Sequence, residues 1–242
     1  MDATQRREEL KSVFAQASGC TRCPQLAATR TTVVFGAGNA DADLMFVGEA
    51  PGRSEDEAGL PFVGQAGRLL DELLGGVGLQ RADVFIANVL KCRPPQNRDP
   101  QPAEIDNCRG YLMAQLELIQ PSVVCTLGNF ATKLLRGDPT GITRIHGKEE
   151  VRVIGPRAVR LLPLLHPAAA LYTPANVDLL RADFARIPGL LALGAPEQPA
   201  RVEAAAAEAA AAAVPTTPGP GPDPFAGPAA TEPEPAPQLG LF

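Results

Sequence analysis

The fold is signalled most clearly by residues 84–98, VFIANVLKCRPPQNR, in which an apolar run ends in a polar loop that contains a cysteine. The run at residues 84–89 is rich in β-favouring side chains, which is typical of a buried strand. Three further runs have the same character, at residues 44–47, 122–127 and 161–165. Four such runs without polar alternation predict strands that are covered on both faces.

Segments with helical spacing of apolar residues lie between and after these runs, at residues 64–76, 102–119, 129–135 and 176–187. Alternation of continuous apolar strands with helices predicts an α/β fold with a parallel sheet. Ligands in such folds bind at the carboxyl ends of the strands. Three of the four strand ends carry polar side chains, Glu49, Asn88 and His166, so we expect one site built from three loops.

The cysteines suggest a second site. Cys20 and Cys23 form a C-x-x-C pair, and Cys92 and Cys108 follow far downstream. No run typical of a secretory or membrane-spanning segment is evident, so we expect a reducing compartment, where clustered cysteines hold metal more often than they form disulfides. Four thiolates suit zinc as well as an iron–sulfur cluster. Cys125 lies within an apolar strand and is expected to be a small core residue.

The composition changes near residue 194. Residues 195–242 hold 11 of the 25 prolines and two alanine runs, without a regular hydrophobic period. We expect this tail to be disordered, with a short helix over residues 204–213, because it has too little apolar surface to offset its ordering entropy. The tail also accounts for the net charge of −5, which leaves residues 1–194 neutral. An acidic overall balance therefore does not exclude a nucleic-acid site.

The polar loops resemble those of the family 4 uracil-DNA glycosylases, the iron–sulfur members of the uracil glycosylase superfamily. The resemblance extends over residues 8–190. It implies a three-layer α/β/α sandwich around a central parallel four-stranded sheet, formed by residues 1–194, with a 4Fe–4S cluster held by Cys20, Cys23, Cys92 and Cys108. The matching segments are GEAPG at 48–52, LPFVGQAG at 60–67, NVLKCRPPQNR at 88–98 and HP at 166–167.

The resemblance implies an enzyme of base excision repair that flips uracil out of DNA and hydrolyses its N-glycosidic bond. Phe62 would stack on the flipped base, although the residue type alone favours packing at a turn. The amide of Asn88 could donate to O4 of uracil and accept from N3–H. His166 could donate a hydrogen bond to O2, where negative charge develops as the base departs.

One difference from the best-known superfamily branch concerns the attacking water. That branch has an aspartate at the position of Ala50 and a tyrosine at that of Gly52. Water would instead be held by main-chain groups, Glu49 or Asn97, and Glu55 could face the C5 edge of the base. The catalytic residues implied are His166, Glu49 and Asn97. The substrate-binding residues implied are Gly48, Ala50, Glu55, Phe62 and Asn88.

Two basic groups could contact DNA phosphates. One surrounds the second cysteine pair, and the other follows residue 143. Ordinary solvated charge is an equal alternative for the second group. Leu171 could act as an apolar wedge or could cap the core, and His146 is expected in a surface loop near phosphates. The basic residues concerned are Lys91, Arg93, Arg98 and Arg109, then Arg144, Lys148, Arg152, Arg157 and Arg160.

The terminal peptide Gln238–Phe242 (QLGLF) is similar to peptides with which bacterial replication proteins bind the sliding clamp of DNA polymerase III. A long tether that ends in apolar anchors suits such docking. The expected partners are thus uracil-containing DNA and this clamp. We expect a monomer that does not bind membranes and acts in the bacterial cytoplasm at the nucleoid.

Other functions fit part of the sequence. A related branch captures uracil-containing DNA covalently through a histidine beside the second motif, but no histidine lies between Asn88 and Cys108. A non-catalytic iron–sulfur protein that binds DNA or carries electrons would leave Asn88 and His166 without a role. A zinc-stabilised DNA-binding or clamp-adaptor protein is the remaining alternative.

Overall fold

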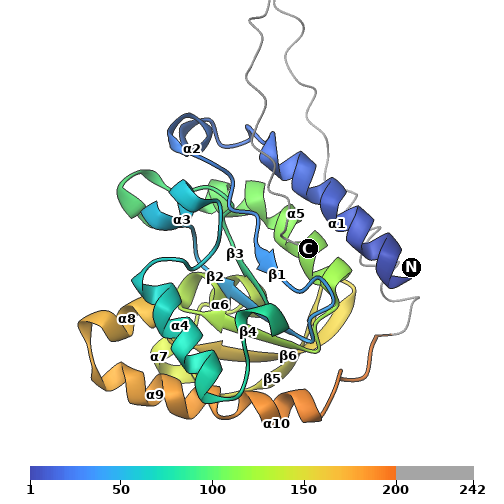
Figure 1. The fold of residues 1–242 in the computed structure, drawn as a ribbon, viewed down its shortest axis with the longest axis vertical. Coiled ribbons are helices and arrows are strands. Elements are labelled where there is room, and N and C mark those ends of the chain that lie inside the picture. Colours follow the sequence, from blue (N-terminus) through green and yellow to red (C-terminus); the bar gives the residue numbers. More distant parts are fainter. Residues whose placement is uncertain (200–242) are drawn as a thin grey trace, which may run out of the picture.

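A six-stranded sheet forms the centre of the molecule in a computed structural model, which describes residues 1–199 (Figure 1). The expected disordered tail, its helix over 204–213 and the clamp-like peptide lie almost entirely outside these residues. The strand order is β1-β3-β2-β4-β6-β5. The strands are Ala37–Gly38 (β1), Leu44–Gly48 (β2), Phe85–Asn88 (β3), Val123–Leu127 (β4), Glu150–Ile154 (β5) and Arg157–Leu164 (β6).

The four inner strands are parallel to one another, as the sequence predicted. The two edge strands are antiparallel to their neighbours and were not predicted. In the central register Gly48 of β2 lies beside Asn88 of β3. The loops that follow these two strands therefore start next to each other.

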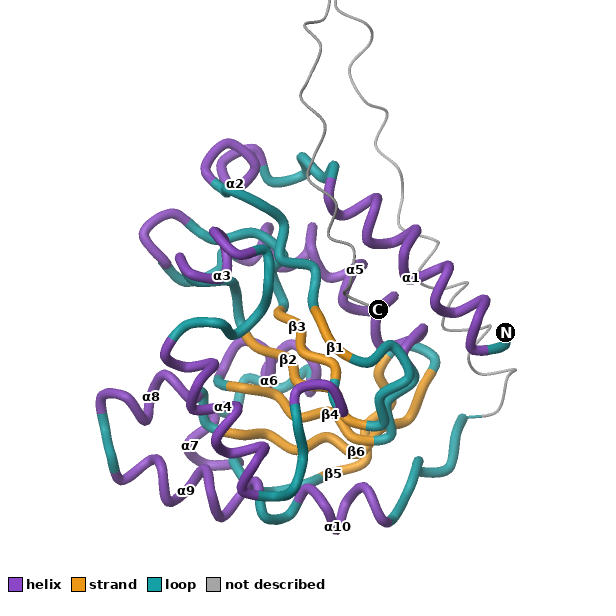
Figure 2. Tube along the Cα trace, in the orientation of Figure 1, coloured by secondary structure: helices purple, strands orange, loops and turns teal. Residues whose placement is uncertain are grey.

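Ten α-helices and two short 3₁₀ helices connect the strands within the described residues (Figure 2). The predicted helices at 64–76, 102–119 and 129–135 are present as α4, α5 and α6, and the predicted 176–187 segment is α9 followed by α10. The α-helices are Ala3–Ser18 (α1), Pro24–Thr29 (α2), Arg53–Ala58 (α3), Gln65–Gly76 (α4), Pro102–Ile119 (α5), Asn129–Arg136 (α6), Ile142–Ile145 (α7), Pro167–Tyr172 (α8), Ala175–Phe184 (α9) and Ile187–Ala192 (α10), and the 3₁₀ helices are Arg81–Asp83 (η1) and Pro95–Asn97 (η2).

Successive residues of each inner strand enter opposite layers of the core. Met45 and Val47 of β2 belong to the layer under α1, α5 and α6. Leu44 and Phe46 face the other layer, under α4 and α7–α10. This arrangement is the expected three-layer sandwich. Cys125 is fully buried in β4, which confirms its predicted place in the core.

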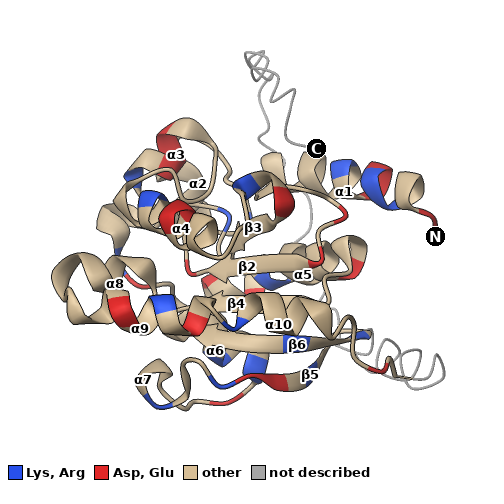
Figure 3. Ribbon diagram, turned by 60° about the horizontal axis from the view of Figure 1, so that its bottom comes forward, with Lys and Arg blue, Asp and Glu red and all other residues tan. Residues whose placement is uncertain are grey.

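Charged residues of both signs are interspersed over the ribbon (Figure 3). Many of the basic residues pair with acidic neighbours, such as Arg136 with Glu150 at 2.5 Å. Among the helices of residues 1–199, none combines the length and apolar character needed to cross a membrane.

Candidate active site and four-cysteine site

A cavity of about 410 Å³ opens where the carboxyl ends of β2, β3 and β6 meet. Its walls come from the three loops expected from the strand ends and from a fourth segment, the turn at Phe62 with the start of α4. All of the predicted catalytic residues line it, together with four of the five predicted substrate-binding residues. The lining residues are Glu49, Ala50, Pro51, Gly52, Glu55, Phe62, Ala66, Asn88, Pro94, Asn97, Arg98, His166 and Ala168.

Asn88 presents an unsatisfied amide at the end of β3. The residue is buried, and its Oδ1 has no hydrogen-bond partner within the described part of the chain. An unpaired buried amide oxygen is costly, so this group is suited to a ligand that donates a hydrogen bond. Gly48 lies beneath the site, where a Cβ would overlap Asn88 Oδ1 and lie 2.7 Å from Phe62 Cζ. Gly48 thus leaves the space that Asn88 and Phe62 occupy.

Phe62 forms an aromatic wall in a strained conformation. Its φ of 53° lies in the left-handed region, which bulky residues rarely adopt. Arg81 holds this turn by donating to the carbonyls of Pro61 (2.9 Å) and Phe62 (2.7 Å). A Cβ on Gly67 would overlap the Phe62 carbonyl. Helix α4 can therefore pack this closely against the turn only with glycine at position 67. Such strain at a pocket wall is typical of functional sites.

His166 is oriented by the helix that it caps. The Ala168 N–H donates to His166 Nδ1 at 3.1 Å, which leaves the proton of the neutral ring on Nε2. Burial lowers the pKa of His166 to about 4, and the nearby Glu55 opposes this shift. The ring is therefore neutral at pH 7. It stacks against Phe62 with 5.7 Å between ring centroids.

Glu49 is the carboxylate with the most perturbed pKa in the cavity. Partial burial, and then the negative charge of Asp99, raise its pKa to about 7. A carboxylate with a pKa near the working pH suits a general base. Asp99 was not singled out from the sequence, because its proximity to Glu49 depends on the fold.

Glu55 and Asn97 also line the cavity, but each is held by the protein. Glu55 Oε1 accepts from the N–H groups of Val63 and Gly64, both at 2.9 Å, and its Oε2 accepts from Gly52 N–H at 3.1 Å. Glu55 thus fixes the two loops that carry Gly52 and Phe62. Asn97 Oδ1 accepts from Arg93 at 2.7 Å, which leaves its Nδ2 for a ligand or water.

The four cysteines predicted to bind metal line one small cavity behind this site, although Cys20 and Cys23 come from the start of the chain. Three of the four sulfurs have a nitrogen donor. The Lys91 N–H donates to Cys108 (3.2 Å), Arg30 to Cys92 (3.2 Å) and Asn107 to Cys23 (3.6 Å).

Burial raises the pKa of the fourth thiol, that of Cys20, but hydrogen bonds with Tyr111 and Arg22 outweigh burial and lower this pKa. Burial raises the pKa of Cys92 and that of Cys108, the latter to about 11. Donors and cations around sulfur stabilise thiolates, so this set of groups fits a thiolate-bound metal cluster. Within residues 1–199, no three side chains of the types that bind metal are gathered closely enough to hold a single ion.

Several of the basic residues proposed for DNA contact bond to other groups of the protein. Lys91 was wrongly assigned, because its side chain is 1 % exposed and its ammonium bonds inside the protein. Arg98 forms a two-point ion pair with Glu104, and Arg152 pairs with Glu150. Arg144 and Lys148 are exposed, as a phosphate contact requires.

Exposure and contacts bear on two further expectations. Leu171 is 44 % exposed, so its side chain is accessible, and its role as a wedge stays a prediction. Tyr172 beside it is 88 % exposed. His146 lies in the turn after α7, half-buried, with its Nδ1 2.7 Å from Asp183 Oδ2, and its expected proximity to DNA phosphates stays a prediction.

An aromatic wall, a buried amide and a neutral histidine line a cavity at the strand ends of this α/β protein, and their chemistry suits a flat, polar heterocycle. Comparison with known proteins agrees with this kind of site. Residues 35–187 match the family model of the Uracil DNA glycosylase superfamily. The chain belongs to this superfamily.

The relatives sharpen the placement within the superfamily. The chain is 46 % identical to the Type-4 uracil-DNA glycosylase of Archaeoglobus fulgidus over 185 residues, which cover 74 % of this chain and 92 % of that protein. It is 44 % identical to the Type-4 uracil-DNA glycosylase of Thermotoga maritima, over 70 % of this chain and 88 % of that protein. A Type-5 uracil-DNA glycosylase of Pyrobaculum aerophilum is 30 % identical, over 66 % and 80 %.

Proposed function

We propose that this protein is a uracil-DNA glycosylase of base excision repair, which releases uracil from DNA by hydrolysis and leaves an abasic site. The observation that carries this proposal is the unpartnered Asn88 amide, placed in one cavity with Phe62 and His166. Membership of the superfamily and the names of the Type-4 relatives agree with it.

The chemistry follows from what each side chain offers. A flipped uracil would stack on Phe62, while Asn88 accepts from N3–H and donates to O4. The neutral His166 would donate from Nε2 to O2 as the glycosidic bond breaks and charge moves onto the base. A donor aimed at developing charge is worth about 2.7–4 kcal/mol in comparable sites. A neutral donor suits this role because it keeps its proton. The base then departs as an anion that the hydrogen bond stabilises.

Glu49 would act on the attacking water or on the sugar. In its ionised form it would orient the attacking water or stabilise positive charge on the sugar, with Asn97 Nδ2 as a second contact for the water. Its raised pKa means that the ionised form is populated only toward neutral pH and above. Glu55 would act as a positioning residue, because both of its oxygens are occupied by main-chain donors.

Cys20, Cys23, Cys92 and Cys108 would hold a 4Fe–4S cluster. The support is the common cavity and the nitrogen donors at three sulfurs. When bound, the cluster would supply a cross-link between the end of α1, the loop after β3 and α5. Residues 1–194 would thus form the catalytic domain.

Residues 195–242 would serve as a tether whose peptide Gln238–Phe242 binds the sliding clamp, so that repair follows replication. The support is the composition of the tail and the resemblance of its last five residues to clamp-binding peptides. The protein would act as a monomer on DNA in the bacterial cytoplasm, at the nucleoid. The exposed Arg144 and Lys148, with Leu171 as a wedge, would contact the DNA.

The test is release of base from a labelled duplex that holds one uracil, with protein purified without oxygen. Free uracil and an abasic site are expected from the wild type, and losses of about 10²–10³-fold are expected for His166→Ala and Asn88→Ala. A DNA adduct that survives denaturant would instead indicate covalent capture. Wild-type protein that binds its metal but neither releases nor captures uracil would overturn the proposal.

A further inference from the structure

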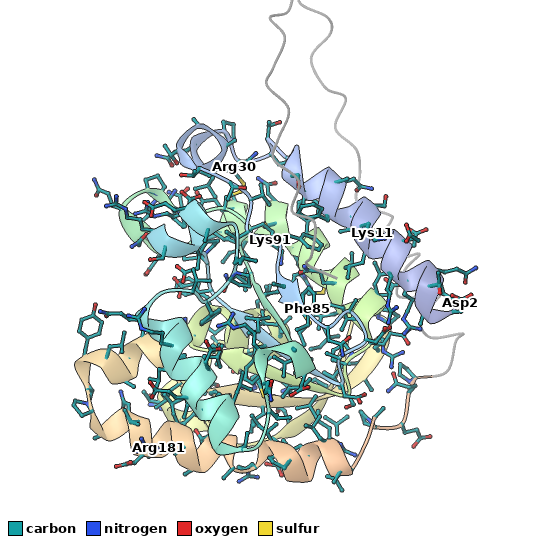
Figure 4. The ribbon with its side chains drawn as sticks, in the orientation of Figure 1. Asp2, Lys11, Arg30, Phe85, Lys91 and Arg181 are labelled. Atoms are coloured by element: carbon teal, nitrogen blue, oxygen red, sulfur yellow. The ribbon has the colours of Figure 1, made fainter. Side chains whose placement is uncertain are left out.

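The buried Lys91 has no role in the chemistry described above. Its side chain is 1 % exposed in a core layer between the sheet and α5, and Figure 4 labels it in the interior of the molecule. Ionised side chains are expensive to bury, and within the described residues the hydrogen-bond partners of this ammonium are a backbone carbonyl and an amide oxygen, neither of them a carboxylate. An apolar residue of similar length would avoid that cost. The lysine therefore supplies something that a hydrocarbon cannot, namely hydrogen-bond donors in fixed directions.

The Lys91 ammonium contacts the backbone of Asn88. Lys91 Nζ donates to the Asn88 carbonyl at 2.9 Å and to Gln115 Oε1 at 2.5 Å. Gln115 is itself fixed, because its Nε2 donates to the Phe35 carbonyl at 2.9 Å. The ammonium also lies 5.7 Å from the centre of the Phe35 ring, where a cation is attracted to the π system. These contacts determine where the ammonium points.

The Asn88 carbonyl needs this donor because the sheet does not provide one. On one side of β3, the neighbouring strand β1 pairs only with Phe85 and Ile86. On the other side, the N–H groups of Val89 and Leu90 donate to the carbonyls of Gly48 and Glu49. A buried carbonyl without a partner would cost about as much as a lost hydrogen bond. Lys91 thus completes the strand end from which the Asn88 amide projects into the cavity.

The same residue is anchored at its backbone to the four-cysteine site, through its N–H to Cys108 Sγ at 3.2 Å. Resting on the proposed function, we propose that Lys91 is a positioning residue for base recognition, which holds Asn88 in the orientation that reads uracil. It acts through Asn88 and does not touch the base. Its loss should therefore weaken binding of uracil while leaving contacts to the DNA backbone in place.

The test is a double-mutant cycle with Lys91→Met and Asn88→Ala, measured as the dissociation constant of free uracil. Lys91→Met keeps the length of the side chain and removes its donors. We expect uracil to bind K91M about tenfold more weakly than wild type, which corresponds to about 1.4 kcal/mol. In the N88A background the same change should alter uracil binding by less than about twofold. Binding of abasic-site duplex should stay at the wild-type level.

Lys11→Met is the matched control, because Lys11 is exposed on α1 and pairs only with Glu8. It should leave uracil binding unchanged. Iron content of each variant is measured alongside, and the wild-type value is expected in K91M because all four cysteines are present. If K91M does not fold, Gln115→Leu takes its place. That change removes one acceptor of the ammonium and should weaken uracil binding in the same way, again only when Asn88 is present.

Two results would overturn the inference while leaving the proposed function intact. One is unchanged uracil affinity in K91M, and in Q115L where that variant is used. The other is an equal loss with and without Asn88. Wild-type protein that neither releases nor binds uracil would overturn the proposed function, and the inference would fail with it.

Discussion

At the scale of single residues, the proposed selectivity of the cavity for uracil depends on which polar atoms of His166 and Asn88 already have a hydrogen-bond partner in the protein. His166 Nδ1 is occupied by the Ala168 N–H, so the remaining ring proton is on Nε2. Asn88 Oδ1 has no partner within the described residues. One fixed donor and one free acceptor match the edge of uracil better than that of cytosine, which carries no N3–H. The specificity argument thus rests on two side chains.

Protonation of His166 at low pH should reduce the free energy of unfolding. Its pKa is lowered by burial from 6.5 to about 4, so the unfolded chain takes up this proton before the native protein does. The resulting stability is fully present above pH 6.5 and is lost as the pH falls through about 4. His166→Asn removes the titration and can still cap α8. In urea unfolding, wild type should lose on the order of 2 kcal/mol more than H166N between pH 7 and pH 4; equal losses would contradict the lowered pKa.

Glu49 should set the acid side of the pH–rate profile. Burial and then Asp99 raise its pKa to about 7, and the proposed chemistry needs the ionised form. The rate of uracil release should therefore rise with pH and level off above about 7. Asp99→Asn removes the like charge, so the rise should move to lower pH. Glu49→Gln should be slow and should lack this rise. An acid limb that is the same in wild type, D99N and E49Q would exclude Glu49 as the titrating group.

The strand pattern predicted that Glu49, Asn88 and His166 meet in one cavity, because polar side chains at the ends of parallel strands converge on one edge of the sheet. The other candidate residues of the cavity came from the resemblance to a known family.

Reasoning from residue types failed for Lys91. A lysine next to Cys92 and Arg93 has the local sequence of a basic surface loop. Its burial depends on Gln115, which lies 24 residues away in the chain and meets it only in the folded protein. Asp99 and Arg81 were missed for the same reason.

At the scale of secondary structure elements, the sequence did not reveal those elements that bury few of their residues. The edge strand β5 exposes Val151 and Val153, so it lacks the continuous burial that marked the inner strands. The strand β1 has only two residues. Helix α1 buries only Leu10 and Ala17, and its strongest sequence signal was the capping box formed by Asp2 and Gln5. An element that is stabilised mainly by contacts with neighbouring elements has only a weak pattern of apolar residues in its own sequence.

The junction of β2 with the turn at Phe62 tolerates only glycine at position 48. A methyl group there would overlap Asn88 Oδ1 and press on the Phe62 ring. Gly48→Ala should therefore lower the single-turnover rate of uracil release by at least about 100-fold and destabilise the fold by about 1–3 kcal/mol. Gly75→Ala in α4 is the matched control, since its methyl group meets nothing within 4 Å. It should raise stability by about 0.5–1 kcal/mol and leave the rate unchanged. A fully active G48A would show that the cavity wall is not fixed as described.

At the scale of the whole molecule, the cavity and the four-cysteine site share structural parts. The segment 88–92 begins with the proposed base-reading residue and ends with a proposed metal ligand. Helix α3 makes a second connection, because Glu55 holds the cavity loops while Asp56 accepts from the backbone of Thr31 at 2.9 Å and 3.0 Å. The N-terminal arm that carries Cys20 and Cys23 is thereby fastened to the site.

This shared construction predicts how the molecule responds to the loss of one thiolate. Cys92→Ser removes the sulfur that accepts from Arg30, and Arg30 also donates to the Cys20 carbonyl at 2.8 Å. The arm at residues 20–32 would then lose both the proposed metal and a direct link to the loop after β3. We expect C92S to lose its iron and visible absorbance, to be cut faster by protease within this arm, and to melt at least about 5 °C lower.

Cys125→Ala is the control, because Cys125 is buried in β4 away from the other four cysteines. This variant should keep its iron. Full iron content in C92S would exclude the four-cysteine assignment. Arg98 also contacts the arm, because it donates to Gln25 Oε1 at 3.0 Å. Iron loss without faster cleavage of the arm would show that Arg98, Asp56 and Arg30 hold it without the metal.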